Sequence, residues 1–218
     1  MSAKITLATQ KSTGLVVHID EVDVNFRDDF RCRECAVDLT VVKSKPRKKE
    51  WHFRHPPEPV CAGGRDTALH DYAVLLLLEN TQIKLTESLN IEYSEPRTEV
   101  TILGFRSDVT GKFQNEEVHF EVFVTHDLGD EKILMYNDNK VKCVRIDLSE
   151  SSLLSASPDT IREAVLNSCD NKRLIYWDGK EKSKNEFGLM ELLLVVAAAI
   201  GLKFLFFSKR KPRNRRKT

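Results

Sequence analysis

Residues 104–126 read GFRSDVTGKFQNEEVHFEVFVTH, and the rest of the chain is organised around them. Two strand-like runs, residues 100–109 and 118–125, flank Gly111, Lys112 and a polar turn, which predicts a β-hairpin. Successive side chains of a strand point to opposite faces. In the second run one face therefore carries Val118, Phe120, Val122 and Val124, and the other carries His119, Glu121, Phe123 and Thr125.

Each run of the hairpin contains one carboxylate that could take part in chemistry. Glu121 is an acid within an apolar strand, and Asp108 lies near the end of the neighbouring run. A buried carboxylate needs a metal ion, a cation or a hydrogen-bond donor beside it. The two acids could hold Mg²⁺ or Mn²⁺, which activate water and neutralise a phosphate, so the pair predicts phosphodiester hydrolysis. The alternative is an ordinary hairpin whose acids are solvated or paired with Arg106 and Lys112.

The order of these motifs resembles a known family. Asp108, the hairpin, Glu121, V-T-H at 124–126 and a downstream Lys132 are similar to the PD-(D/E)xK nuclease-like proteins related to the competence protein CoiA. That family also places a C-x-x-C and an H-F-x-H segment ahead of the nuclease core, as residues 32–35 and 52–55 do here. The resemblance covers residues 32–148. It implies a restriction-endonuclease-like core with the element order α-β-β-β-α-β.

The resemblance also implies roles for individual residues. Asp108 and Glu121 would hold the catalytic Mg²⁺ or Mn²⁺, and Lys132 would stabilise the charge that develops on the phosphate. His70 and His126 would assist, although His70 could be an ordinary helix-surface residue and His126 could cap a turn with Asp127. Lys132 could likewise be an ordinary surface lysine.

One residue departs from the family pattern. The motif lysine, two residues after the acid, is Phe123 here. Either Lys132 or another cation substitutes for it, or the site is catalytically inactive.

A second group of residues predicts a structural zinc site. Cys32, Cys35, His55 and Cys61 have spacings that suit a tetrahedral ion. Four protein ligands leave no open position for water, and binding could contribute on the order of 10 kcal/mol to folding. His52 is the substitute for His55, since only one of the pair can point inward on an extended segment. The alternative is a reduced C-x-x-C with a solvent-facing histidine pair.

The periodicity of the remaining sequence predicts a mixed α/β protein. Strands are expected at 4–9, 15–22, 36–42, 89–93, 142–148 and 173–178, and helices at 65–80, at 129–137 and from Ser157 with Pro158 in its first turn. Asp66 or Thr67 is the expected N-cap of the first helix, and residues 95–97 are expected to form a turn. The predicted parts are an N-terminal hairpin and zinc segment (1–64), a nuclease-like core (65–178), a linker (179–187), a transmembrane helix (188–207) and a basic tail (208–218).

Charge and cysteine usage limit the function classes. The chain has 34 Lys and Arg against 33 Asp and Glu, but eight of the basic residues lie in 203–218, which has no acid, so the rest is acidic. This distribution argues against a broad basic groove for nonspecific nucleic-acid binding. Five unevenly spaced cysteines do not form a secreted disulfide scaffold, and the first residues lack the apolar run of a signal peptide. A cytoplasmic body is therefore expected.

Residues 188–207 read GLMELLLVVAAAIGLKFLFF, twenty residues that as a helix would span about 30 Å, the thickness of the hydrocarbon layer. Glu191 and Lys203 lie near the ends, where long charged side chains can reach the interface. The segment predicts a single-pass C-terminal anchor with the body in the cytoplasm, although the positive-inside rule alone would place the basic tail there. The alternatives are a helix packed in a protein core or an oligomer, and a helix that lies in the membrane interface.

These features together predict a membrane-tethered, metal-dependent nuclease that acts on DNA. The competing hypothesis is a noncatalytic adaptor that binds nucleic acid or protein through a degenerate nuclease fold, and Phe123 is the residue that favours it.

Overall fold

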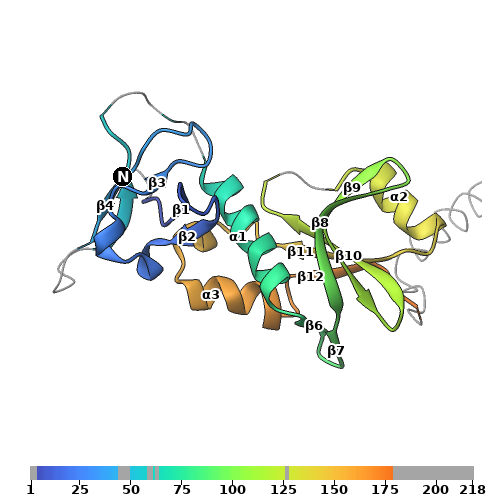
Figure 1. Cartoon of the computed structure of the whole chain (residues 1–218). Coiled ribbons are helices and arrows are strands. Elements are labelled where there is room, and N and C mark those ends of the chain that lie inside the picture. Colours follow the sequence, from blue (N-terminus) through green and yellow to red (C-terminus); the bar gives the residue numbers. More distant parts are fainter. Residues whose placement is uncertain (1–3, 44–49, 58–60, 62–63, 126–127, 179–218) are drawn as a thin grey trace, which may run out of the picture. The chain divides into compact units, whose positions relative to one another are not determined.

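The computed structural model describes residues 4–43, 50–57, 61, 64–125 and 128–178, which belong to one compact unit that ends at Asp178 (Figure 1). His126 and the predicted linker, transmembrane helix and basic tail lie outside the described residues. Within the described residues, no helix is both long and apolar enough to cross a bilayer.

A five-stranded sheet positions the candidate acids. Its strands run in the order β12-β11-β10-β9-β8, with the bounds Ser94–Ile102 (β8), Phe105–Phe113 (β9), Glu116–Phe123 (β10), Lys142–Asp147 (β11) and Lys172–Tyr176 (β12). β8, β9 and β10 form an antiparallel meander, β11 runs parallel to β10, and β12 is antiparallel to β11. The parallel pair requires a crossover between β10 and β11, and this crossover contains a helix.

The hairpin in the central sheet forms, but its turns differ from the prediction. Residues 100–109 do not form one strand, because the chain reverses at Leu103 and Gly104, both with positive φ, between β8 and β9. Gly111 does not lie in a turn; it pairs with Val118 inside the hairpin, and the turn falls at Gln114 and Asn115. A Cβ at Gly111 would lie 2.5 Å from the ring of Tyr93, so glycine is needed here for close packing.

One other prediction near the sheet is wrong, and one predicted strand pairs outside the sheet. Residues 95–97 are not a separate turn but part of β8, where the register with β9 shifts between Ser94 and Arg97. Pro96 is tolerated because β8 is an outer strand and the shift interrupts the ladder. The expected strand at 89–93 forms as β7 (Leu89–Glu92), but it pairs with β6 (Gln82–Thr86) in a separate two-stranded sheet. The first strand of the central sheet is therefore β8.

Two helices cover opposite faces of the central sheet, as Figure 1 shows. Helix α1 (Arg65–Glu79) packs its apolar side chains against Val118, Phe120, Val122 and Val124, as the alternation of β10 predicts. Helix α2 (Asp130–Asp138) contributes Met135 and Tyr136 to a smaller cluster with Cys143 of β11. The N-cap of α1 is Gly64 rather than Asp66 or Thr67.

The N-terminal residues form a second core that contacts α1. β1 (Leu7–Gln10) pairs with β2 (Val16–His18) in the predicted hairpin and also with β3 (Phe30–Arg31), while β4 (Thr40–Val42) pairs with β5 (His52–Arg54). The short 3-10 helices η1 (Ile19–Glu21) and η2 (Val24–Phe26) follow β2. Leu7 and Val16 pack into the same core as α1, so the N-terminal hairpin is continuous with the sheet domain.

The last described segment closes the core beside α1. A 3-10 helix η3 (Ser151–Ser155) precedes α3 (Pro158–Arg162), which Ser157 caps as predicted, and a π-helical turn η4 (Glu163–Asn167) leads to β12. Ile161, Val165 and Leu166 are buried in the main core. The structure thus confirms a mixed α/β class in which strands outnumber helices among the described residues.

Candidate functional site

Asp108 on β9 and His70 on α1 meet beside the sheet. The Asp108 Oδ2 atom lies 3.2 Å from His70 Nε2 and accepts a hydrogen bond of 2.8 Å from the backbone N–H of Val122. Burial would raise the pKa of Asp108, but the hydrogen bond and positive charge of His70 outweigh it and hold that pKa below its usual range. The hydrogen bonds that the His70 ring donates to Asp108 and then to Asp71 raise the pKa of His70 to about 9, so the imidazole is charged at neutral pH.

Glu121 on β10 is bound by two residues of α2. Its Oε2 atom accepts a 2.7 Å hydrogen bond from Lys132 Nζ, and its Oε1 atom accepts one of 2.5 Å from the Tyr136 hydroxyl. Lys132 Nζ also donates to the Arg106 carbonyl at 2.6 Å. Lys132 therefore lies at the candidate site, where the sequence resemblance places a relocated lysine.

Burial sets the acidity of Glu121. Only 3% of this residue is exposed, and burial raises its pKa although the bonds from Lys132 and Tyr136 oppose the shift. The negative charge of Asp108, which lines the same cavity, raises the same pKa further. Burial and the neighbouring Glu121 charge also raise the pKa of Tyr136, which remains a neutral donor.

One cavity of about 540 Å³ beside the N-terminus of α1 is lined by His70, Asp108, Glu121 and Lys132. The charged residues of its wall are Glu34, Asp66, His70, Asp108, Glu121 and Lys132. Phe123 also lines it, and the ring of Phe123 stacks under the Arg145 guanidinium at 4.3 Å. An aromatic ring thus stands two residues after Glu121, and the amine that contacts Glu121 comes from Lys132 of α2.

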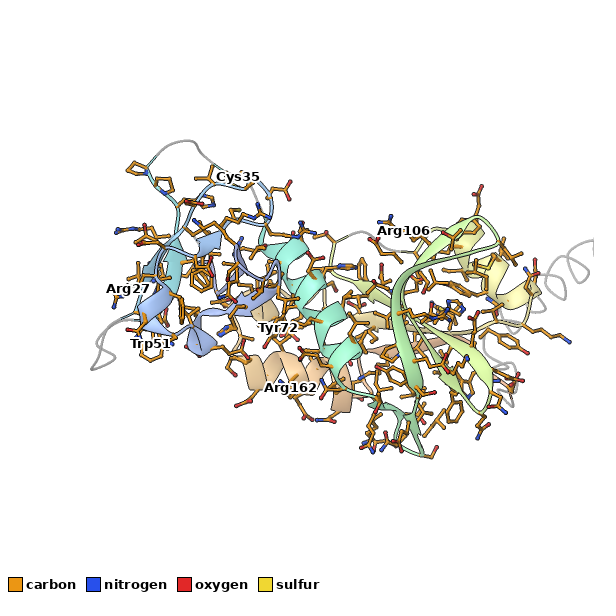
Figure 2. The ribbon with its side chains drawn as sticks, viewed as in Figure 1. Arg27, Cys35, Trp51, Tyr72, Arg106 and Arg162 are labelled. Atoms are coloured by element: carbon orange, nitrogen blue, oxygen red, sulfur yellow. The ribbon has the colours of Figure 1, made fainter. Side chains whose placement is uncertain are left out.

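The second constellation is the Cys/His cluster of the N-terminal region. The ligand atoms of Cys32, Cys35, His55 and Cys61 all lie within 4.8 Å of one another. Figure 2 shows Cys35 near the first turn of α1. The Cys32 and Cys61 sulfurs are 3.8 Å apart. Two sulfurs that each lie about 2.3 Å from a tetrahedral zinc ion are separated by about 3.8 Å, so the geometry fits zinc.

The state of His55 gives an independent test of this cluster. Both of its ring nitrogens are buried without a hydrogen-bond partner among the described residues, which is costly unless a metal ion binds one of them. His52 turns away instead, and its Nδ1 lies 3.0 Å from the Glu50 carbonyl. The cluster can hold a metal such as zinc, with His55 rather than His52 as the fourth ligand.

The thiols of this cluster differ in acidity before a metal binds. Burial raises the pKa of Cys32 to about 11. For Cys35, hydrogen bonds from the Val37 backbone and the neighbouring thiols outweigh the opposing effect of burial and lower the pKa. Zinc binds thiolates, so binding would displace the proton that Cys32 otherwise retains.

The Cys/His cluster packs directly against α1, the helix that carries His70. A Cβ on Gly64 would lie 2.9 Å from Glu34 Cβ and 3.1 Å from Cys32 Sγ, and Gly64 has φ of +98°. Thr67 Oγ1 also donates to Glu34 Oε2 at 3.4 Å. The loop from Cys32 to Cys35, hereafter the zinc knuckle, therefore fits the N-terminus of α1.

The structure brings together four of the five expected catalytic residues, Asp108, Glu121, Lys132 and His70, and all four expected zinc ligands. His126 lies outside the described residues. Among the described residues the Cys/His cluster is the one group of three or more side chains at metal-ligand spacing, and Asp108 and Glu121 belong to no such group although they line the same cavity.

Sequence reasoning missed Tyr136. A signal for it exists, because Tyr136 follows Lys132 by four residues and so lies on the same side of α2.

No protein-family model, curated protein or solved structure matches this chain.

Proposed function

We propose that this protein is a metal-dependent nuclease with a restriction-endonuclease-like core, which cleaves phosphodiester bonds of DNA and is tethered to a membrane by residues 188–207. The observation that carries the proposal is the contact of Lys132 with Glu121 in the cavity that also contains Asp108 and His70. Two carboxylates can hold a divalent ion that activates water and polarises a phosphate, and a nearby cation can stabilise the charge that develops on it.

The topology supports the same proposal. A helix, a three-stranded antiparallel meander, a second helix and a strand parallel to the third follow one another as α1, β8, β9, β10, α2 and β11, with the β6–β7 hairpin inserted after α1. This is the α-β-β-β-α-β order of the family that the sequence resembles.

Asp108 and Glu121 are the residues that would hold Mg²⁺ or Mn²⁺. Magnesium is commonly bound through one or two carboxylates and keeps several waters, so a two-carboxylate donor set fits it. When bound, such an ion polarises the phosphate and promotes deprotonation of a water. The chain's own residues supply the rest: His70 holds Asp108 in its ionised form, and Lys132 offers a positive charge to the phosphate oxygens as negative charge develops on them.

The second candidate function is a noncatalytic adaptor with a degenerate nuclease fold. Two observations favour it: Phe123 stands at the motif lysine position, and both carboxylate oxygens of Glu121 already accept hydrogen bonds from α2. In an adaptor these bonds would only satisfy a buried acid.

Incubation of the full chain with double-stranded DNA, single-stranded DNA and RNA in Mg²⁺ or Mn²⁺ separates the two functions. A nuclease should cleave DNA, Glu121→Gln should abolish cleavage, and Lys132→Met should slow it by about 10²–10³-fold. Glu117→Gln is the matched control, since this acid of the same strand is exposed and pairs with Arg97. Equal inactivity of wild type and Glu121→Gln, with unchanged DNA binding, would establish the adaptor.

A further inference from the structure

A chain of charged residues connects the zinc knuckle to the candidate catalytic acids. Arg33 lies between the metal-binding residues Cys32 and Cys35, and its Nε donates to Asp71 Oδ2 on α1. The other oxygen of Asp71 lies 3.4 Å from Nδ1 of His70, whose Nε2 faces Asp108 at 3.2 Å. Positive and negative groups therefore alternate from the knuckle to the cavity.

The geometry of His70 depends on both of its neighbours. An imidazole can rotate about its side-chain bonds, and a partner on each ring nitrogen restricts that rotation. Asp108 binds one nitrogen, and Asp71 lies near the other. Asp71 is itself free to choose among side-chain orientations unless a second group holds it, and the Arg33 guanidinium is that group.

The backbone of Arg33 is fixed by the Cys/His cluster. Residues on either side of it, Cys32 and Cys35, contribute to the cluster, and the adjacent Glu34 packs on Gly64 at the start of α1. An arginine on a loop without this support would lose more side-chain and backbone entropy on forming the pair. The zinc knuckle thus presents Arg33 in a defined position next to α1.

We propose that Arg33 is a positioning residue for the catalytic metal site: held by the zinc knuckle, it orients His70 through Asp71 and so fixes Asp108 for binding a divalent cation. This inference rests on the proposed function, because it concerns the same Asp108 and Glu121 pair. It assigns the zinc knuckle a role in the site beyond folding. Residues that orient a metal ligand typically change metal affinity by about 10–100-fold when mutated.

Binding of Mn²⁺ to the zinc-loaded full chain, measured by electron paramagnetic resonance, tests the proposal. The site of interest is the Mn²⁺ site that is lost in Glu121→Gln. The Mn²⁺ affinity of this site should fall about 10-fold in Arg33→Ala, and Arg33→Lys should restore part of that affinity. Arg31→Ala is the control, because Arg31 is exposed one position before the knuckle and makes no ion pair within the described part of the chain. Zinc content and melting temperature should stay at wild-type values in Arg33→Ala.

A double-mutant cycle tests the order of the relay. Asp71→Asn lies on α1, outside the knuckle, and should weaken Mn²⁺ binding as much as Arg33→Ala does. The double variant should be no weaker than either single variant if both act through His70, whereas independent effects would multiply. Wild-type Mn²⁺ affinity in Arg33→Ala, or multiplied effects in the double variant, would overturn the proposal.

Nitrogen-15 NMR of the His70 ring separates this inference from the proposed function. The ring signals, assigned with His70→Gln, should shift in Arg33→Ala and Asp71→Asn and stay unchanged in Arg31→Ala, with zinc alone present. If the wild type has no Mn²⁺ site that depends on Glu121, the proposed metal chemistry is wrong. Unchanged ring signals in Arg33→Ala would instead reject the relay from Arg33 to His70.

Discussion

At the scale of single residues, the candidate site is a set of ionisable groups whose charges are matched in pairs. His70 pairs with Asp108, and Lys132 pairs with Glu121. Burial alone would disfavour the ionised form of both carboxylates. Removing one member of a buried ion pair leaves an uncompensated charge, which costs about 3–5 kcal/mol in proteins. The pairing therefore explains how the sheet tolerates two acids, whether or not the site turns over a substrate.

Tyr136 should contribute measurably to stability through the same site. Tyr136→Phe removes the hydroxyl that donates to Glu121. The Oε1 atom of this buried carboxylate then loses that hydrogen bond. We expect the free energy of unfolding, measured by urea denaturation, to fall by about 1–3 kcal/mol.

Tyr176→Phe is the matched control for this substitution. The Tyr176 hydroxyl lies 3.2 Å from Asp178 Oδ1 in an exposed pair, so its loss should change stability by less than about 0.5 kcal/mol. Equal effects of the two substitutions would show that the hydrogen bond to Glu121 contributes nothing specific.

The sequence predicted the identity of the site residues better than their partners. Asp108 and Glu121 stand out because acids are unusual in apolar strands, and the zinc ligands because their spacing is characteristic. Asp71 and Arg33 carry no such signal, since charged residues on a helix and in a turn are ordinary. Their pairing depends on how the knuckle packs on α1, which is a tertiary contact between residues far apart in the chain.

At the scale of elements, the packing of the zinc knuckle on α1 depends on a single glycine. Gly64→Ala would place a methyl group 2.9 Å from Glu34 Cβ in a backbone conformation that alanine disfavours. We expect a loss of about 2–3 kcal/mol in urea denaturation, together with weaker zinc retention.

Gly14→Ala isolates the contribution of the clash. Gly14 also has positive φ, at +75°, but no atom lies within 4 Å of the position a Cβ would take. The Gly14→Ala variant should lose only the stability that the unfavourable backbone conformation of alanine costs, about 1 kcal/mol, and it should retain zinc. A Gly64→Ala variant that behaves like Gly14→Ala would show that the knuckle does not press on α1.

Loss of the metal should destabilise the N-terminal core. Cys61→Ser removes one ligand of the cluster, and we expect the purified variant to contain less than one zinc per chain and to melt at a lower temperature. Cys169→Ser is the control, because Cys169 lies outside the cluster and its thiol contacts Glu87. Zinc-free wild-type protein with a normal melting curve would contradict the assignment.

The errors in the predicted elements share a physical cause. Residues 100–109 begin with the β-branched run Val100 to Ile102 and end with Val109, so their local pattern reads as one strand and does not reveal the reversal at Leu103 and Gly104. Glycine usually marks a turn, whereas Gly111 lies within a strand and accommodates the ring of Tyr93. Each error arises where tertiary packing outweighs local preference.

At the scale of the whole molecule, the described unit has two larger hydrophobic cores joined through α1 and one smaller cluster around Met135 and Tyr136. The first core contains the helix and one face of the sheet, and the second contains Phe30, Phe53 and the cysteines of the Cys/His cluster. Tyr72 on α1 donates to Glu21 at 2.9 Å, and His18 contacts the Ala156 carbonyl at 3.0 Å. These contacts should make residues 4–178 unfold cooperatively.

The sequence predicts that membrane attachment and the candidate site are separable. Deletion of residues 188–218 should leave a soluble protein that retains any hydrolysis or ligand binding, since the described residues of the candidate site lie within residues 32–136. In fractionation, the full chain should remain in the membrane pellet through a high-salt wash and leave it in detergent.

Two other outcomes would point elsewhere. Release by salt alone would mean that electrostatic attraction of the basic tail is the anchor. Solubility of the full chain without detergent would reject the transmembrane assignment.

The irregular outer strand β8 also has a consequence for solubility. A long, regular strand at the edge of a sheet exposes unpaired amides to which another chain can add, and repeated addition leads to fibrils. In β8 Pro96 offers no N–H, the register shifts between Ser94 and Arg97, and Glu95 and Glu99 bring charge and positive φ to the same edge. The residues that make this strand look like a turn in the sequence are thus the ones that keep separate copies of the protein from joining sheet to sheet.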